Sequence, residues 1–438
     1  ERWLKMELTM HHYPVRSLSW GASTQYKDGH LSVNKEELLH MLTKKGLLTD
    51  VEIEDIQLIQ PHTSVRVVNI FDVFAARCRL GQGTVNYPGV LGPLQIVGNG
   101  QTATLDHFAI LAVSRRINRY NKILDMSGPG SEVTPYASFY HIALLIKPKC
   151  AQLEETKYHT LMKKIGLHTG CYLAQVAATT PPDRTTYYSL EEPVDQTKPP
   201  MHHQRPRVAY VCMLSSHQRS ALGEPVLYGD DVSGLLPTVI HPNEFLDGAV
   251  IAPGYNLGID TYSFQNNPVI LNLYRRHNGD VDFAGVVVCV AHITRDRRER
   301  TVQMAANLVK NILKADAAVL TKVGGGIPES DLLAIVKVLE ENQVATTPII
   351  WAHWGDGTLE DSLSVTSPLA NAVVSVGINE EWLSLSAQKQ VIGGGVPVPY
   401  IAQSEDDHVL SAALQVHYRD VCGAINQLGS SKVSLVEY

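Results

Sequence analysis

The sequence is short of basic charge, of long apolar runs and of paired cysteines. Its 438 residues carry a net charge of −7, which leaves no basic field of the kind that holds nucleic acid. The longest apolar runs, such as residues 285–291, fall well short of the roughly 20 residues that span a bilayer. The first residues contain no apolar segment typical of a signal peptide. We therefore expect a cytoplasmic protein that binds neither nucleic acid nor membrane.

Cysteine usage excludes several kinds of site. The six cysteines lie far apart and form no CxxC pair: Cys78, Cys150, Cys171, Cys212, Cys289 and Cys422. This spacing argues against a zinc ribbon, a thioredoxin-type redox centre and a secreted disulfide framework. The composition, 44% hydrophobic and 18% charged, is typical of a compact globular protein. A chain of this length has room for two domains.

Residues 1–180 predict a mixed, strand-rich α+β N-terminal domain. Asn34 has the side chain and position expected of a helix N-cap. A long helix is expected over about 151–178. We expect it to break near Gly166 and Gly170, because glycine weakens a continuous helix.

Residues 181–206 contain six prolines and predict a linker or crossing segment. Apolar runs of strand length then alternate with helical patterns over 207–438, and a final helix is expected over about 405–428. Such alternation is typical of a parallel, Rossmann-like sheet covered by helices on both faces. The fold class is therefore α/β in this second domain. Ligands in this architecture usually bind at the carboxyl ends of the strands.

A glycine loop joins one of these strands to a helix. It contains three consecutive glycines, Gly324, Gly325 and Gly326. Their N–H groups suit an anion, but Glu329 and Asp331 in the first helical turn would repel a phosphate. The spacing fits neither GxGxxG nor GxxxxGK[ST], which argues against a nucleotide. Two interpretations stay open, a site for a small carboxylate or amine and a purely structural turn.

Two histidines follow strand ends. His292 comes after the apolar strand 285–291, and His353 stands between two tryptophans with Asp356 close behind. A histidine at a strand's carboxyl end, beside apolar walls, suits acid/base or metal chemistry. A histidine packed against indoles with a structural hydrogen bond is the alternative for His353.

Two further arrangements of these residues are not supported by spacing. Cys289 and His292 lie three apart on a strand, so their side chains point to opposite faces and form no local dyad. A divalent metal held by His241, Glu244, His292 and His353 would require distant turns to converge. No spacing of the HExxH kind supports such a metal site.

Several segments, taken in this order, resemble one known family: "DGHLSVNKEELL", "YPGVLGPLQIVGNGQT", "HPNEFLDGAV", "NNPVILNLYRRH" and "LTKVGGGIPESDLL". The chain resembles the pyruvoyl-type component B subunit of the glycine, sarcosine, betaine and D-proline reductases. The resemblance implies a proprotein that cleaves itself at an internal cysteine, which becomes a pyruvoyl group. It implies that this group binds the substrate amine as a Schiff base while a selenol or thiol of a partner subunit attacks the substrate carbon. It also implies a cytoplasmic hetero-oligomer.

The segment over residues 241–260, "HPNEFLDGAVIAPGYNLGID", departs from that pattern. The resemblance places the processed cysteine shortly after "HPNEFLDGAV", where this sequence has Gly254 and Tyr255. Between Thr238 and Thr261 there is no serine, threonine or cysteine. Self-cleavage requires a short hydroxyl or thiol side chain that attacks the preceding carbonyl and is then eliminated, and tyrosine does neither. We therefore expect an intact chain without a pyruvoyl group and predict no other cofactor.

Two hypotheses follow. In the first, the chain is a divergent component B-like subunit that cleaves a carbon–heteroatom bond, in the first instance C–N, of a small substrate by reduction or elimination. Its partner is a thiol- or selenol-bearing subunit. In the second, the chain is a non-catalytic scaffold for that partner. The intact polar turn "HPNEFLDG" favours the enzyme.

The candidate residues follow from the first hypothesis. Proton transfer or polarisation would fall to His241, Glu244, Asp247, His292 and His353. Substrate binding would fall to Asn243, Tyr255, Lys322, Gly324, Gly325, Gly326 and Asp356. The amine of Lys322 suits a Schiff base with a carbonyl substrate, and an ordinary surface lysine is the alternative.

Overall fold

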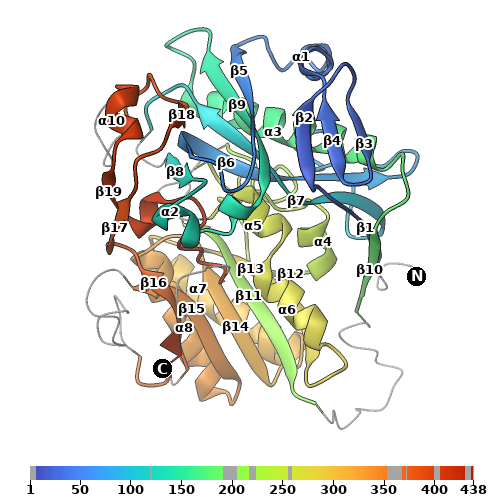
Figure 1. The fold of residues 1–438 in the computed structure, drawn as a ribbon. Coiled ribbons are helices and arrows are strands. Elements are labelled where there is room, and N and C mark those ends of the chain that lie inside the picture. The colour runs from blue at the N-terminus through green and yellow to red at the C-terminus, as the bar shows by residue number, and fades with distance from the viewer. Residues whose placement is uncertain are drawn as a thin grey trace.

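The computed structural model describes residues 6–118, 121–190, 205–216, 223–254, 259–352, 367–370, 372–398, 405–429 and 436–437. An eight-stranded mixed sheet occupies one half of the molecule and a seven-stranded, mainly parallel sheet the other. In Figure 1 the first sheet lies above the second, and helices α4 and α5 lie between them. No helix within the described ranges is both long and apolar enough to cross a membrane.

The eight-stranded sheet is built mainly from the first 190 residues. Its strands are β1 (Glu7–Pro14), β5 (Val51–Ile59), β6 (Val65–Leu80), β7 (Gly100–Ser114), β8 (Lys122–Asp125), β9 (Tyr140–Pro148), β10 (Arg184–Ser189) and β18 (Gln390–Ile392). Residues 65–78 of β6 are all buried, so this strand is covered on both faces. A smaller sheet packs beside it, formed by β2 (Ser17–Trp20), β4 (His30–Val33) and β3 (Gln25–Lys27).

The short helices of this half are α1 (Lys35–Lys44), α2 (Pro129–Glu132) and a 3-10 turn (Tyr136–Ser138). The expected cap of α1 is confirmed. The side chain of Asn34 accepts a hydrogen bond from the N–H of Glu37 at 2.9 Å, which satisfies one of the free donors of the first turn.

Helix α3 (Glu155–Ala177) is continuous, so the expected break at its glycines is wrong. A Cβ atom on Gly166 would overlap the ring of Phe74, and one on Gly170 would lie 2.8 Å from the carbonyl oxygen of Ala75. Both glycines therefore allow the helix to approach β6 closely. Tertiary packing outweighs the local weakness of glycine in a helix.

The region expected to be a linker contains a strand. Residues of β10 pair with β1 in antiparallel register, from Arg184 opposite His12 to Ser189 opposite Glu7. The proline-rich segment thus contributes an edge strand to the first sheet before it crosses. Residues 191–204 lie outside the described part of the chain.

The second sheet contains the parallel strands of the chain's second half. Its order is β12 (Thr238–Ile240), β13 (Asp282–Ala291), β11 (Arg207–Ser216), β14 (Ala317–Lys322), β15 (Ala345–Ala352), β16 (Val374–Ile378) and β20 (Val436–Glu437). Strands β13, β11, β14, β15 and β16 run parallel, while β12 and β20 are antiparallel edges. Strand order reverses between β11 and β14, a position where such sheets commonly bind ligands.

Helices cover both faces of this sheet. On one face lie α7 (Arg295–Asn307), a π-helical turn (Leu308–Ile312) and α8 (Ile327–Glu341). On the other face lie α4 (Pro242–Leu246), α5 (Thr261–Gln265) and α6 (Pro268–Arg276). The core residues of β11 alternate between the two apolar clusters, as expected for a strand buried on both faces.

The C-terminal segment returns to the first sheet. It contains β17 (Trp382–Leu385), β18, α10 (Asp407–Ser411), β19 (Leu414–His417) and a 3-10 turn (Tyr418–Asp420). The expected helix over 405–428 is therefore wrong, since the α-helix there has five residues. Strand β18 pairs with β6 in parallel, and in Figure 1 these elements lie beside the first sheet. Residues 382–398 and 405–422 thus lie outside the α/β unit expected for 207–438.

Candidate functional site

The polar turn at α4 is held by its own side chains. The Nδ1 atom of His241 accepts a hydrogen bond from the N–H of Asn243 at 3.2 Å, and Glu244 Oε1 accepts one from the N–H of His241 at 2.6 Å. These reciprocal bonds form a capping box. The other oxygen of Glu244 accepts from the hydroxyl of Tyr228 at 2.5 Å. Burial lowers the pKa of His241 to about 4 and raises the pKa of Glu244.

Asp247 and Asn243 fasten the same turn to the first sheet. One oxygen of Asp247 accepts from the N–H of Gly98 at 2.7 Å and lies 2.9 Å from Arg79 Nε, and the other accepts from Thr102 at 2.6 Å. Asn243 donates to the carbonyl of Gly98 at 3.1 Å. Both side chains are almost fully buried. Their polar atoms are therefore used to join the two halves of the molecule.

Lys322 is completely buried, so the alternative of a surface lysine is wrong. Its Nζ atom donates to the carbonyl of Gly324 at 2.7 Å, lies 3.4 Å from Glu329 Oε2 and stands 5.2 Å from the ring centre of Trp351. Burial lowers the pKa of Lys322, and the charge of Glu329 acts in the opposite direction. The glycine loop thus surrounds an internal ion pair, with Gly326 at a φ of +74° before α8.

His292 and Asp331 lie together at the carboxyl end of β13. The N–H of His292 donates to Asp331 Oδ2 at 3.0 Å, and the guanidinium of Arg298 pairs with the other oxygen of Asp331. Arg298 also donates to the hydroxyl of Ser330 at 2.6 Å. The carboxylate of Asp331 therefore connects the end of β13 and helix α7 to the first turn of α8.

Three of the candidate residues belong to segments that the structure does not describe. His353, Asp356 and Tyr255 fall outside the described residues. Among the residues that are described, no group of three or more His, Cys, Asp or Glu side chains is placed to hold a metal ion.

A buried polar cluster that the sequence did not indicate surrounds the main chain at residues 252–254. Glu224 accepts a hydrogen bond from the N–H of Gly254, and its other oxygen lies 2.7 Å from Nδ1 of His159. Both side chains are nearly fully buried. Burial acts to raise the pKa of Glu224, but the hydrogen bond from His159 and the charge of Lys163 outweigh it and lower this pKa. A Cβ atom on Gly254 would overlap the Glu224 carboxylate.

A buried ion pair lies on the other side of Pro253. Lys163 Nζ lies 3.1 Å from Asp72 Oδ2 and donates to the carbonyl of Ala252. Asp72 accepts hydrogen bonds from both the N–H and the hydroxyl of Thr261, at 2.8 and 2.7 Å. The hydroxyl of Thr261 accepts in turn from the N–H of Ala252 at 3.1 Å. Four titratable side chains, Asp72, His159, Lys163 and Glu224, thus surround a short stretch of main chain.

A weak sequence signal for this cluster exists. His159 and Lys163 are four residues apart and lie on the apolar, buried face of α3. Charged or titratable residues on a buried helix face require partners. The identity of those partners, Asp72 and Glu224, follows only from the fold.

Asp260 is a further buried carboxylate close to this cluster. It caps α5 by accepting from the N–H of Ser263 at 2.8 Å, and it accepts from the hydroxyl of Tyr136 at 2.7 Å. Burial raises the pKa of Asp260 to about 6, against these hydrogen bonds. Asn426 donates to the hydroxyl of Ser263 at 2.7 Å and so brings the C-terminal segment to the same place.

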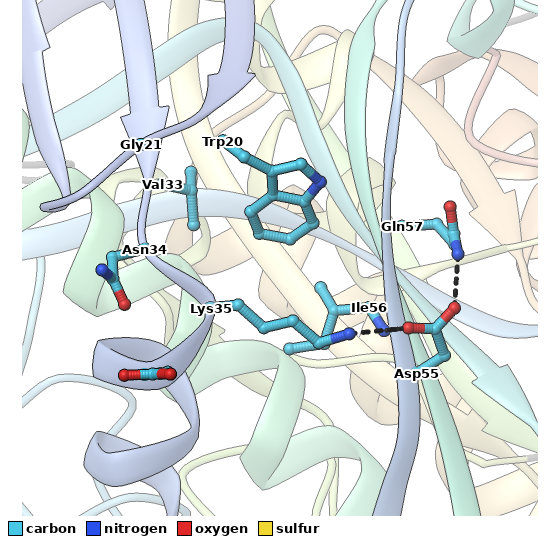
Figure 2. A pocket seen from close by; sticks show the side chains of 9 residues that line it. Trp20, Gly21, Val33, Asn34, Lys35, Asp55, Ile56 and Gln57 are labelled. Carbon is cyan, nitrogen blue, oxygen red and sulfur yellow. Dashed lines mark hydrogen bonds and ion pairs between the residues drawn. The ribbon is translucent and has the colours of Figure 1, made fainter.

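An open hollow of about 490 Å³ lies at the start of α1, away from these groups. Figure 2 shows Trp20 on one side and Lys35 reaching to Asp55 on the other. The Lys35 ammonium donates to Asp55 at 2.8 Å, and both side chains are partly exposed. Burial acts to raise the pKa of Asp55, but the hydrogen bonds from Lys35 and Gln57 outweigh it and lower this pKa, which keeps the carboxylate as the partner of Lys35.

Comparisons with known proteins find relatives that match nearly the whole chain. The family model for glycine/sarcosine/betaine reductase component B subunits matches residues 6–436. The glycine reductase complex component B subunits alpha and beta of Peptoclostridium acidaminophilum are 27% identical over 438 residues, 99% of this chain and 100% of theirs. The sarcosine reductase complex component B subunit alpha of that organism is 27% identical over 86% of this chain and 87% of its own length. No solved structure matches. The chain therefore belongs to the family of glycine, sarcosine and betaine reductase component B subunits.

Proposed function

We propose that this chain works as an uncleaved component B-like subunit of a multi-subunit reductase complex. The named relatives are parts of glycine and sarcosine reductase complexes, which supports a hetero-oligomer. The sequence from Val239 to Asp260 lacks any residue able to cleave the chain and form a pyruvoyl group. Position 254 has no room for a side chain beside Glu224. The residues present therefore do not fit that cofactor.

The proposed reaction is cleavage of a C–N bond in a small substrate. A thiolate or selenolate of the partner subunit forms a bond to the substrate carbon, and the amine leaves with the electron pair of the C–N bond and takes up a proton. This chain would bind and orient the substrate and supply that proton. The His159–Glu224 pair is the proposed source, because its two groups share a hydrogen bond and adjoin the segment 252–254.

The observation that carries the enzyme hypothesis is the buried polar cluster around that segment, which contains the Lys163–Asp72 ion pair and the hydrogen-bonded His159 and Glu224. Removing an ion from water costs several kcal/mol even after relaxation, so the buried Lys163–Asp72 ion pair and the buried Glu224 carboxylate cost more free energy than holding one turn requires. A scaffold needs only a surface for its partner. A role in catalysis at residues 252–254 would account for these buried groups.

A specific observation favours the scaffold as the second candidate. The retained turn at α4 was the argument for an enzyme, yet His241, Glu244 and Asp247 all make hydrogen bonds within the protein. The turn would therefore persist for structural reasons in a subunit without activity. The cluster around residues 252–254, and not the α4 turn, therefore distinguishes an enzyme from a scaffold.

Mass measurement of the purified chain under denaturing conditions tests the absence of self-cleavage. We expect one species at 48.2 kDa. Two fragments that sum to this mass would show that a residue outside the expected place performs the cleavage.

Turnover of the reconstituted complex separates enzyme from scaffold. Glu224→Gln keeps the shape of the side chain and an oxygen for the Gly254 N–H, but removes the charge that faces His159. We expect turnover to fall by about a hundredfold or more, the usual loss when a general acid/base group is removed. Lys164→Met, beside the buried Lys163, is the matched control and should leave turnover unchanged. Full turnover of the Glu224 variant in an intact complex would favour the scaffold.

A further inference from the structure

A pocket of about 720 Å³ lies between the two halves of the molecule. One wall comes from β1, β6, β7 and β10 of the first sheet, and the other comes from α5, α6 and the end of α4. Ligand sites of this size occur preferentially at domain interfaces. The four titratable residues around segment 252–254 do not line this pocket, so it is distinct from the candidate site above.

The lining is basic although the chain as a whole is acidic. Arg77, Arg184 and Arg275 line the pocket, whereas Asp106 is the acidic residue among its lining side chains. Asp106 already has partners. It lies 2.9 Å from Nδ1 of His12 and 3.4 Å from Arg184. Two arginines thus line the pocket without an ion pair to any described residue.

Arg77 is the buried cation of this pocket, with 3% of its surface exposed. Its guanidinium donates to the carbonyls of Leu246 and Gln265 at 2.5 and 2.7 Å and to the side chain of Asn266 at 2.7 Å. All three acceptors are neutral. Its Nε is buried and has no hydrogen-bond partner in the described part of the chain. The carboxylates of Asp106 and Asp247 act on Arg77 through their charge, but they contact His12 and Arg79 directly, so an anion in the pocket would give Arg77 a direct ion pair.

Aromatic rings supply the apolar part of the lining. The rings of Tyr188 and Tyr274 lie 5.1 Å apart, and those of Phe139 and Tyr262 lie 5.6 Å apart. Such faces favour flat apolar groups by stacking or edge contact. The volume also exceeds what a two-carbon amino acid would fill.

We infer that this interdomain pocket binds an aromatic carboxylate, with the carboxylate facing Arg77 and Arg275 and the ring among the tyrosines. The inference concerns binding alone and stands whether or not the chain is catalytic. The arginines of the pocket favour an anion, and its aromatic rings favour a flat apolar group. An anion without a ring, or a ring without the anion, satisfies only one of them.

Titration calorimetry on the full chain tests the inference with three probes. Phenylacetate should bind saturably with a Kd below about 1 mM. Phenylacetamide has the same ring but no charge, and acetate has the charge but no ring. Each should bind at least about tenfold more weakly, the effect of one charge-assisted or stacking contact.

Neighbouring arginines of α6 provide matched variants. Arg275→Gln should weaken phenylacetate binding by roughly tenfold, since one charged hydrogen-bond donor is lost. Arg276 does not line the pocket and pairs with the exposed Asp280 at 2.5 Å, so Arg276→Gln should bind like the unaltered chain. Arg184→Gln is a second variant at the exposed rim and should also weaken binding.

Three results would overturn the inference. They are the absence of saturable binding by phenylacetate, equal binding of phenylacetate and its amide, and unchanged affinity in both the Arg275 and Arg184 variants. Arg77 is left unaltered because it also holds α4 and α5 in place. Thermal unfolding of each variant establishes that the protein tested is folded.

Discussion

Arg66 and Asp125 form a two-point ion pair in the interior, with Nε to Oδ1 at 2.7 Å and Nη2 to Oδ2 at 2.8 Å. The remaining donors of Arg66 bind the carbonyls of Ser386, Leu410 and Ala412 at 2.8, 2.6 and 2.7 Å. One side chain of the first sheet thus holds the C-terminal segment at three places.

Arg66→Met should destabilise the protein by about 3–5 kcal/mol, because it leaves a buried carboxylate without its partner. Urea unfolding measures the loss, and limited proteolysis should cut first within the freed segment around residues 386–412. Arg16→Gln is the control, since the Arg16–Asp183 pair is exposed on both sides. That change should cost less than about 1 kcal/mol. Equal effects of the two substitutions would contradict the role given to Arg66.

Gly166→Ala should destabilise α3, although alanine is the better helix former by about 1 kcal/mol. The added methyl group would overlap the ring of Phe74, and overpacking of this kind costs about 1–3 kcal/mol. Urea unfolding of the single variant and of Gly166→Ala with Phe74→Leu checks the cause. The smaller leucine should recover part of the loss. A stabilised single variant would mean that helix propensity outweighs the contact.

Asp260 should make the protein less stable as the pH rises from about 4 to about 6. Its pKa is 3.8 in the unfolded chain, and burial raises it to about 6 in the folded protein. In that interval the folded state binds more protons, so the unfolding free energy falls with rising pH. Asp260→Asn keeps an acceptor for the N–H of Ser263 but does not titrate. Urea unfolding at several pH values should show this slope removed in the variant.

Titration of His241 should make the protein less stable as the pH falls from about 6.5 to about 4, which is opposite to the effect of Asp260. Burial lowers its pKa from 6.5 to about 4, so its contribution is present above pH 6.5 and is lost as the pH falls towards 4. His241→Asn keeps a side-chain acceptor for α4 and should lose less stability on acidification. The two effects oppose each other in the unaltered chain, so each variant is compared with it at every pH. Parallel curves for the His241 variant would refute its titration.

Lys322 and Glu329 should show strong coupling in a double-mutant cycle. Both are fully buried, so Lys322→Met or Glu329→Leu alone breaks a buried ion pair and should cost about 3–5 kcal/mol. The double variant should lie close to the unaltered protein, because both charges are gone and Trp351 offers an apolar neighbour. The exposed pair Lys337–Glu341 on the same helix serves as control. Additive losses at 322 and 329 would rule out the coupling.

Local sequence signals predicted local structure well. The Asn34 cap and the apolar strand expected over 285–291 depend on neighbours within a few residues, and the structure contains both. The helix over 151–178 was also indicated, but its continuity was not. The glycines of α3 are explained by a strand about ninety residues earlier in the chain, which no local pattern reveals.

The candidate site was less accessible to such reasoning. Asp72, His159, Lys163 and Glu224 come from three distant parts of the chain and meet only through the packing of α3 on β6. Lys322 shows the same limit. Its position at the end of an apolar strand fits both a surface residue and a buried one, and only the fold, which places Glu329 beside it, decides between them.

The return of the C-terminal segment to the first sheet has a consequence for any break in the chain. A cut within residues 255–258 would leave two pieces that still share the β18–β6 pairing and the hydrogen bonds of Arg66. Such pieces would migrate as one particle in a native gel or a sizing column. During translation, β6 pairs with β18 only after residues 390–392 have been synthesised. Arg66 binds the carbonyls of Leu410 and Ala412 later still. The first sheet thus begins at β1 and is complete only after β18 has been synthesised.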